Sequence, residues 1–576
     1  MTEAEHDTRS GASIATLPIL PFTWRDGFRV LSTLGMVLGG FTSLGALILL
    51  VYTHQNPAFD VIQSPGGLLF RFVAFGLITA CFATCLWRLR ERNPLAPPTF
   101  PPRRVEVRAI GLLVLLLTGI LGLLVFRIGD YPWAAPDEIH HLNVARNLAI
   151  HGSYASGHPE TGFTYFDSFD SVGPAVIVPV ATGFRVFGVS LVVARAIVVA
   201  FFLVLCGAFF QFGRKLFGGW SGALSVGLLV GTFSSIYLGR TLYGEVPAFT
   251  FLLLGLLAWH EALEHPKRYA WGLSAGALIG LAVLSKSIVV LVVFSFAGVW
   301  AYDRVTFRKI HWVHVVLPTM GGLAVLSCWT LAQANHGPQE GADGGLLAIY
   351  QHYLLFGLES LPFALANSVV HNPVAHLVWL VVAVVSVPLV FRHRYTPAGA
   401  ALYLYGVFML YWWYFFTPGQ LHRYLWNAYA IFALFSAPWL AMAMGEVLNR
   451  GASRRNRVLW ACCVILLLAP GLRWVTLQGR EIGTKVEMAE EKAIVRALAA
   501  FPQEIRIVTT SGRLPGLLNF FAGRSIDTGT GLSNLLGTYD VVVLPDRPEN
   551  RADVPPGTSL KTVGGFVLLS STKTLE

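Results

Sequence analysis

Long apolar stretches separated by short polar ones run through most of the chain. Thirteen of them are roughly 17–25 residues long, which is the length a helix needs to cross a bilayer. They lie near 28–52, 66–87, 108–127, 190–212, 220–238, 247–263, 270–284, 287–302, 312–333, 374–391, 398–416, 424–446 and 457–473. The segment 172–188 is apolar too, but two prolines and a glycine interrupt it, so we expect a re-entrant or surface helix there. The pattern predicts an α-helical polytopic membrane protein with about 13 transmembrane helices.

Composition supports this fold class. Of the 576 residues, 54% are hydrophobic and only 13% are charged, and the mean hydropathy is +0.59. A soluble protein carries roughly 25% charged residues. The six cysteines lie in apolar spans without zinc-like spacing, so we interpret them as small buried apolar residues. Residues 1–27 are polar, and the first apolar run is too long for a cleavable signal peptide.

Lysine and arginine gather in every second loop between the predicted spans. The basic loop residues are Arg88, Arg90, Arg92, Arg103, Arg104, Arg108, Arg214, Lys215, Lys267, Arg268, Arg304, Arg308, Lys309, Arg392, Arg394, Arg450, Arg454, Arg455 and Arg457. Excess positive charge marks cytoplasmic loops, so the N-terminus is predicted to be cytoplasmic and the C-terminus outside. The net charge of +10 belongs to these loops and does not indicate a nucleic-acid partner.

The last hundred residues differ from the rest of the chain. Helix-like stretches at 481–500 and 514–521 alternate with strand-like stretches at 505–509, 539–544 and 566–569. This alternation predicts a small α/β domain outside the membrane. No glycine-rich phosphate-binding motif and no catalytic constellation is apparent within it.

Two adjacent carboxylates and two adjacent imidazoles lie where an apolar span ends, in 131–148. Pro136 favours the first position of a helix, which would put Asp137 and Glu138 in the first turn. Apolar residues recur at helical spacing until Gly152, which favours a helix end. The pattern predicts a short amphipathic helix on the membrane surface. The two carboxylates have two interpretations, a functional site or a simple complement to the helix dipole.

Basic residues are scarce on the predicted outer face. Those near the membrane surface are Arg146, Arg185, Arg195, Arg240, Lys286 and Arg423. A charge in or beside a transmembrane segment is by default a functional hypothesis, and the alternative is a side chain that extends to lipid headgroup phosphates. The acidic Glu245 also begins a predicted outer helix end, with first-turn capping as its alternative.

Short motifs follow one another in a set order along the predicted outer face. They are Asp137-Glu138 after a span, Phe187-Gly188-Val189-Ser190, Ala194-Arg195, Gly239-Arg240 with Glu245 five residues on, Leu284-Ser285-Lys286, and His422-Arg423-Tyr424. This order resembles the GT-C superfamily of membrane glycosyltransferases that use polyprenyl-phosphate sugars. The nearest-looking branch contains the protein O-mannosyltransferases and the bacterial lipid A aminoarabinose transferases. The resemblance covers roughly 108–450.

Three features depart from the pattern of these relatives. Two spans precede the usual first span, and Glu245 stands where relatives often have Asp. His140 and His141 stand where relatives often have an aromatic residue after the Asp-Glu pair. Asp137 and either histidine have one-turn spacing that suits a metal ion, so a divalent metal is a candidate cofactor.

The resemblance implies transfer of a sugar from a polyprenyl-phosphate donor to a lipid, glycan or protein acceptor, with inversion at the anomeric carbon. It implies that Asp137 is the general base and that Glu138 and Glu245 orient the acceptor or hold a metal. It assigns the donor phosphate to Lys286, Arg423, Tyr424 and Arg240. Two other classes stay open, a polytopic secondary transporter and a non-catalytic lipid-glycan binding protein. Transporters usually show internal repeats, and none is apparent here.

The expected organisation follows from the spans, the charges and the resemblance. A cytoplasmic tail (1–27) precedes two extra N-terminal helices with a basic cytoplasmic loop (28–107). The transmembrane catalytic module covers 108–474, with outer loops at 128–189 and 335–373, and the α/β domain covers 475–576. The resemblance implies the bacterial inner membrane, with the active site outside the cytoplasm.

Overall fold

The computed structural model describes most of the chain from Arg103 to Ser570. Not described within these bounds are 160–161, 167–171, 335–372, 394, 417–421, 449–452, 486–487, 503, 512–513, 523–526, 529–534, 537–538, 547–553, 555–557 and 564. The predicted spans 28–52 and 66–87 and nearly all of the predicted loop 335–373 therefore lie outside the described residues.

Helices dominate the described part of the chain up to residue 484. The long ones are α3 (Arg103–Val125), α6 (Leu191–Phe217), α7 (Gly219–Val230), α9 (Glu245–Glu264), α10 (Tyr269–Ser285), α11 (Val292–Thr306), α12 (Val313–Ala334), α15 (Pro373–Pro388), α16 (Pro397–Phe416), α17 (Trp426–Leu448) and α18 (Arg454–Thr484). Short helical turns η2 (Ser287–Leu291), η3 (Leu389–His393) and η4 (His422–Leu425) adjoin α11, α15 and α17.

Seven helical stretches in the described residues are long and apolar enough to cross a membrane. They are Val107–Val125, Leu191–Phe217, Glu245–Glu264, Ser287–Thr306, Val313–Ala334, Arg423–Gly445 and the stretch that begins at Trp460 in α18. The chain is thus a helical polytopic membrane protein, and the total of about thirteen spans stays a prediction. The predicted span 220–238 is wrong as one helix. It breaks after α7, where the Thr232 hydroxyl donates to the carbonyl of Leu229 at 2.7 Å and the short α8 (Ser235–Leu238) follows.

Small residues let the helices approach closely. A methyl group at Gly276 of α10 would collide with the backbone of Pro318 in α12, and one at Gly222 of α7 would lie 2.6 Å from the Phe210 carbonyl oxygen of α6. Close backbone packing of this kind is typical of helices in membranes, where van der Waals contact replaces the hydrophobic effect as the force between them.

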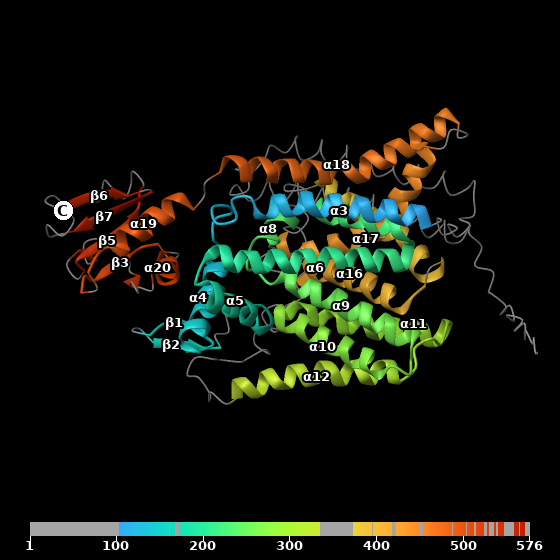
Figure 1. Ribbon diagram of the computed structural model, residues 1–576, viewed down its shortest axis with the longest axis horizontal. Helices are drawn as coiled ribbons and strands as arrows, with labels where there is room; N and C mark the ends of the chain where they lie inside the picture. The colour runs from blue at the N-terminus through green and yellow to red at the C-terminus, as the bar shows by residue number, and fades with distance from the viewer. Residues whose placement is uncertain are drawn as a thin grey trace, which may run out of the picture. The chain divides into compact units, whose positions relative to one another are not determined.

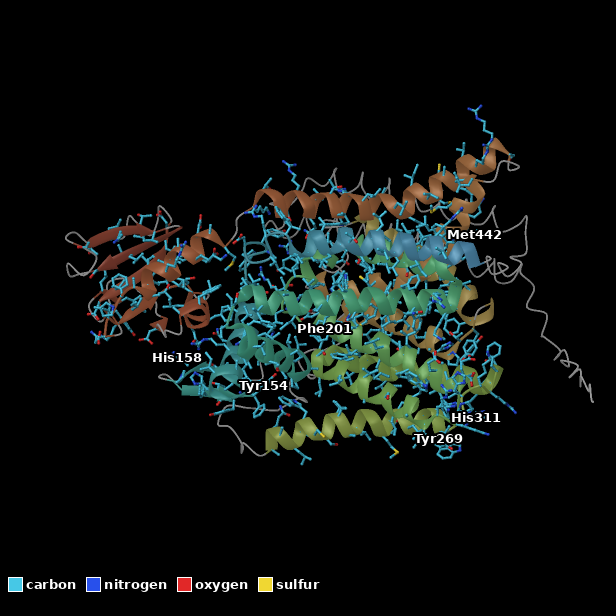
Figure 2. All side chains as sticks on the ribbon, viewed as in Figure 1. Tyr154, His158, Phe201, Tyr269, His311 and Met442 are labelled. Carbon is cyan, nitrogen blue, oxygen red and sulfur yellow. The ribbon has the colours of Figure 1, made fainter. Side chains whose placement is uncertain are left out.

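Two short helices and a hairpin lie together at one end of the helical bundle (Figure 1). They are α4 (Pro136–His151), α5 (Pro174–Phe187), and the antiparallel strands β1 (Ala155–His158) and β2 (Gly162–Tyr165). Figure 2 shows Tyr154 and His158 at this end and Tyr269 and His311 at the opposite end. Because α10 begins at Tyr269, directly after Lys267 and Arg268, this basic loop lies at the end away from α4.

The C-terminal region is a mixed sheet with two helices. Its elements are α19 (Ala489–Ala499), β3 (Ile507–Thr509), α20 (Leu514–Ala522), β4 (Asp527–Thr528), β5 (Val541–Pro545), β6 (Ser559–Val563) and β7 (Phe566–Ser570). The strand order is β4-β3-β5-β7-β6, with β3 parallel to β5 and β7 antiparallel to it. The predicted strands at 505–509, 539–544 and 566–569 are confirmed as β3, β5 and β7. The predicted helical stretch at 481–500 is divided between two helices, since α18 ends at Thr484 and α19 begins at Ala489.

The structure also corrects the prediction for α4. Half of its residues are buried, including the polar Glu138, His141, Asn143 and Asn147. An amphipathic surface helix would bury a single face. Instead α5, α20 and β1 all contact α4, so it packs against protein on several sides.

Candidate functional site

The ends of α4 form as the sequence predicts. Pro136 stands at the start of the helix, so Asp137 and Glu138 occupy the first turn. Gly152 ends it with φ of 71°, a left-handed conformation that glycine adopts without strain. The two adjacent carboxylates therefore point to different sides of one helix, since successive residues are about 100° apart around the axis.

Glu138 forms a fully buried ion pair. Its carboxylate accepts hydrogen bonds from Nε and Nη2 of Arg195 at 3.1 and 2.8 Å, and both side chains have 0% exposure. The backbone N–H of Leu242 donates to the same carboxylate at 3.2 Å. Arg195 also donates to the carbonyls of Ile128 and Pro132, each at 2.9 Å. With these partners, Glu138 anchors the start of α4 to α6, and the geometry offers no support for a contact with the acceptor.

Arg240 is held by backbone carbonyls. It is completely buried and donates to Leu123, Phe126 and Tyr131 at 2.8–2.9 Å. It therefore stabilises the turn that connects α3 with α4. This arrangement does not support the predicted contact between Arg240 and the donor phosphate.

Four other charged residues meet at one place, from four separate elements. Arg423 of η4 donates to the Asp137 carboxylate at 2.6 Å, and its Nε lies 3.7 Å from Glu245 at the start of α9. Lys286, just after α10, places its Nζ 3.5 Å from the same Glu245 oxygen. The side chains of Glu245 and Lys286 are 1% and 4% exposed, whereas those of Arg423 and Asp137 are 15% and 29% exposed. We call Asp137, Glu245, Lys286 and Arg423 the charged cluster.

Backbone contacts fix the places where two of these residues lie. Gly244, with φ of 85°, lets α9 begin beside the loop after α10, where a Cβ would lie 2.8 Å from the Ser285 carbonyl oxygen. Lys286 has extended backbone and forms an isolated antiparallel bridge with Val172. These contacts hold Lys286 and the start of α9 next to each other.

Two tyrosines surround the cations of the cluster. The guanidinium of Arg423 lies 4.5 Å from the ring centroid of Tyr243 and 5.4 Å from that of Tyr424, and the Lys286 ammonium lies 5.6 Å from that of Tyr424. Lys286 also donates to the Tyr243 carbonyl at 3.3 Å. Rings in these positions attract cations and shield them from water. The sequence analysis predicted Tyr424 as a site residue but not Tyr243. The position of Tyr243 between Arg240 and Glu245 could have indicated it.

The two histidines of α4 lie beside the cluster. Burial, followed by the charges of His140, Lys286 and Arg423, keeps the pKa of His141 well below its usual value. His141 is therefore neutral at pH 7. Among the described residues, no group of three or more histidine, cysteine or acidic side chains is placed to hold a metal ion. The metal role of His140 and His141 stays a prediction.

The charged cluster is electrically balanced, since two carboxylates face two cations. Asp137 is the more exposed carboxylate, and Arg423 is the more exposed cation. An arriving anion can contact both cations there, but it competes for them with Glu245 and with the partly exposed carboxylate of Asp137. This arrangement suits chemistry in which an anionic leaving group departs while a carboxylate takes a proton.

A known family model matches part of the chain. Residues 172–331, which include Glu245 and Lys286, match the family model described as dolichyl-phosphate-mannose-protein mannosyltransferase. No curated protein matches the chain.

Solved structures of other proteins have a similar fold. The structure of ArnT from Cupriavidus metallidurans in the apo state matches with a TM-score of 0.57 and 15% sequence identity, over 81% of this chain and 99% of that one. The structure of the same protein bound to undecaprenyl phosphate matches with a TM-score of 0.56 and 14% identity, over the same shares of the two chains. At these identities the likeness shows the fold alone.

Proposed function

We propose that this chain is a membrane glycosyltransferase, which transfers a sugar from a dolichyl- or polyprenyl-phosphate carrier to an acceptor outside the cytoplasm. The single observation that carries the proposal is the charged cluster, in which the exposed carboxylate of Asp137 lies 2.6 Å from a cation. One of the structures with this fold holds undecaprenyl phosphate, which supports a polyprenyl-phosphate carrier for this chain too.

Lys286 and Arg423 bind the donor phosphate. Arg423 can contact two phosphate oxygens with its planar fork, whereas Lys286 acts as a point charge. Tyr424, whose ring lies near both cations, completes this side of the site. The buried Glu245 contacts both cations and positions them, and it takes no part in proton transfer.

The transfer is a single displacement that inverts the anomeric carbon. The acceptor oxygen or nitrogen forms a bond to that carbon while the bond from the carbon to the phosphate oxygen breaks. The electron pair of the broken bond goes to the phosphate, which gains a negative charge that Lys286 and Arg423 meet. The acceptor proton goes to Asp137, a contribution typically worth about 10²–10⁴ in rate.

The contact between Asp137 and Arg423 sets the order of events. In the structure one oxygen of Asp137 is occupied by a hydrogen bond from Arg423, so it cannot face the acceptor. When the donor phosphate takes Arg423 as its partner, that oxygen becomes available to the acceptor proton. The donor therefore binds before the acceptor is activated.

The orientation supports an active site outside the cytoplasm. The loop with Lys267 and Arg268 lies at the end of the bundle away from α4 (Figure 2), and loops of this kind stay cytoplasmic. The thirteen spans, the extracytoplasmic domain at 475–576 and the bacterial inner membrane belong to the same proposal. A reporter active only outside the cytoplasm should work when fused after Pro338 and fail after Gly451.

One experiment tests the proposal directly. Purified protein and extracted cell envelope are incubated with radiolabelled polyprenyl-phosphate sugars, and the covalent transfer of each label is measured for wild type, Asp137→Asn and the control Asp540→Asn. We expect transfer by wild type and by the control only. Donor binding without transfer by wild type would assign the chain to the lipid-glycan binding proteins, and label moved across the membrane unattached would assign it to the transporters.

A further inference from the structure

We propose that helix α20 of the C-terminal region positions the general base Asp137. It does so by packing against the side of α4 that faces away from Asp137. This inference rests on the function proposed above, because it concerns the same Asp137. The contacts between α20 and α4 link the C-terminal region to the proposed chemistry.

The contacts lie on the side of α4 that faces away from Asp137. Counting about 100° per residue, Ile139, Asn143 and Arg146 lie about 180–240° around the helix from Asp137. All three contact α20. The Asn143 amide donates to the carbonyl of Gly516 at 3.0 Å, and Arg146 donates to the Asn519 side-chain oxygen at 3.3 Å.

Ile139 of α4 lies against Gly516 of α20. A Cβ added at Gly516 would lie 2.6 Å from Cγ2 of Ile139 and 3.5 Å from Nδ2 of Asn143. Cγ2 belongs to a β-branched side chain, which has little freedom to turn away. Gly516 is therefore the residue that lets the two helices reach hydrogen-bonding distance.

Buried side-chain amides also connect α20 and α4 to the hairpin of β1 and β2. The Asn519 amide donates to the Gly157 carbonyl of β1 at 3.1 Å. Asn147, fully buried in α4, donates to the carbonyls of Ala155 and Gly157 at 3.0 Å each. A buried amide that loses its partner destabilises the fold, so these hydrogen bonds hold α4, β1 and α20 in one relative position.

The same C-terminal stretch also holds the loop that leads into α4. Lys492 contacts the Asp130 carboxylate at 2.6 Å, and this hydrogen bond lowers the pKa of Asp130. The backbone N–H of Met488 donates to the Asp130 carbonyl at 3.3 Å, and the Met488 sulfur accepts from the N–H of Ala134 at 3.2 Å. The polypeptide on both sides of Pro136 is thus fixed from the C-terminal region.

The position of α4 should affect the rate of sugar transfer. A misplacement of a reacting group by about 1 Å costs about 10²-fold in rate, and Asp137 sits on a helix whose other face meets the charged cluster. Loosening the back of α4 should therefore lower kcat. The donor KM should stay near its wild-type value, because Lys286 and Arg423 are not on α4.

The test combines a truncation with a size exchange. Asn143→Ala and Gly516→Ala should each lower kcat by about tenfold, with the donor KM within about twofold of wild type. Adding Ile139→Ala to Gly516→Ala removes the clashing Cγ2 methyl and should restore part of kcat, whereas adding Ile139→Val keeps that methyl and should not. Arg506→Ala, in an exposed pair of the same region, is the control and should act like wild type.

A second measurement does not depend on turnover. Backbone amides of 136–151 should exchange hydrogen for deuterium faster in Asn143→Ala and Gly516→Ala, with no change in α6. Unchanged exchange in α4, unchanged kcat in a folded variant, or a kcat that falls only as the folded fraction falls would each overturn the positioning role. Absence of sugar transfer by wild type would refute the proposed function, and faster exchange would still establish the docking of α20.

Discussion

Asp137 and Glu138 are neighbours in one helical turn, yet the structure places them in opposite environments. Glu138 has no exposed surface, and its carboxylate accepts hydrogen bonds from Arg195 and from one backbone N–H. Asp137 is 29% exposed, and its carboxylate accepts a hydrogen bond from the partly exposed Arg423. Pairs of titratable groups in contrasting environments divide structural from reactive roles. Asp137 is the more exposed of the two, and a substrate can replace its partner Arg423, so Asp137 is the carboxylate that can take part in the reaction.

The largest expected effect comes from Asp137→Asn. The amide keeps the shape of the side chain and cannot take the acceptor proton, so turnover should fall by about 10²–10⁴ with little change in thermal unfolding. Binding of undecaprenyl phosphate, measured by titration, should be equal or a few-fold tighter, because the phosphate no longer competes with a carboxylate for Arg423. Near-normal turnover would assign Asp137 to helix capping.

Glu138→Gln should damage stability instead of chemistry. It leaves the Arg195 guanidinium buried without a counter-charge, and breaking a buried pair in this way costs about 3–5 kcal/mol. Thermal unfolding in detergent measures the loss. Glu261→Gln is the matched control, because it removes a partly exposed pair worth about 0–1 kcal/mol. A Glu138→Gln protein that unfolds like wild type but turns over slowly would give Glu138 a direct part in the reaction.

Variants of Arg423 and Lys286 test the other half of the site, the proposed contacts with the donor phosphate. Arg423→Ala or Lys286→Ala should lose most activity, and Arg423→Lys only part of it, because lysine cannot bind two phosphate oxygens at once. The loss should appear in kcat, since the departing phosphate gains charge as the bond breaks, and steady-state kinetics at varied donor concentration separates kcat from KM. Two alanine variants that bind and turn over normally would reduce both residues to lipid-headgroup anchors.

The smallest effect is expected from Tyr243→Leu. The leucine keeps an apolar contact beneath Arg423 but removes the ring, a cation–π contribution of about 0.5–2 kcal/mol in partly desolvated places. Turnover should therefore fall a few-fold, with a shallower loss than for Arg423→Lys. A drop as large as that of Arg423→Ala would mean that the Tyr243 ring or hydroxyl contacts the substrate.

Much of the fold could be read from local sequence patterns. Apolar length located the helices, and Pro136 and Gly152 located the ends of α4, because these signals act within a few residues. The strands β3, β5 and β7 are apolar and buried, so their pattern is clear. β4 has two residues and β6 is mostly exposed, so neither has a pattern that distinguishes it from a loop.

The members of the charged cluster could be predicted, but not their partners. Asp137, Glu245, Lys286 and Arg423 each follow or precede an apolar span on the same predicted side, which is enough to suggest a shared site. The burial of Glu138 depends on Arg195, which is 57 residues away and comes from another helix. The carbonyls that hold Arg240 lie more than a hundred residues before it. Contacts at such separations are set by tertiary packing, which a local pattern does not contain.

The length of α18 makes it a spacer whose register matters. Its 31 residues extend about 46 Å at 1.5 Å per residue, against about 30 Å of hydrocarbon in a bilayer. Near its end, Glu481 accepts the Tyr131 hydroxyl at 2.7 Å, and the carbonyls of Ile482 and Gly483 accept from Arg127. One residue inserted before Glu481 would turn these groups by about 100° and shift them by about 1.5 Å, whereas seven would return them to nearly the same face. The length of α18 therefore determines whether its last turn can contact Arg127 and Tyr131, the residues just before α4.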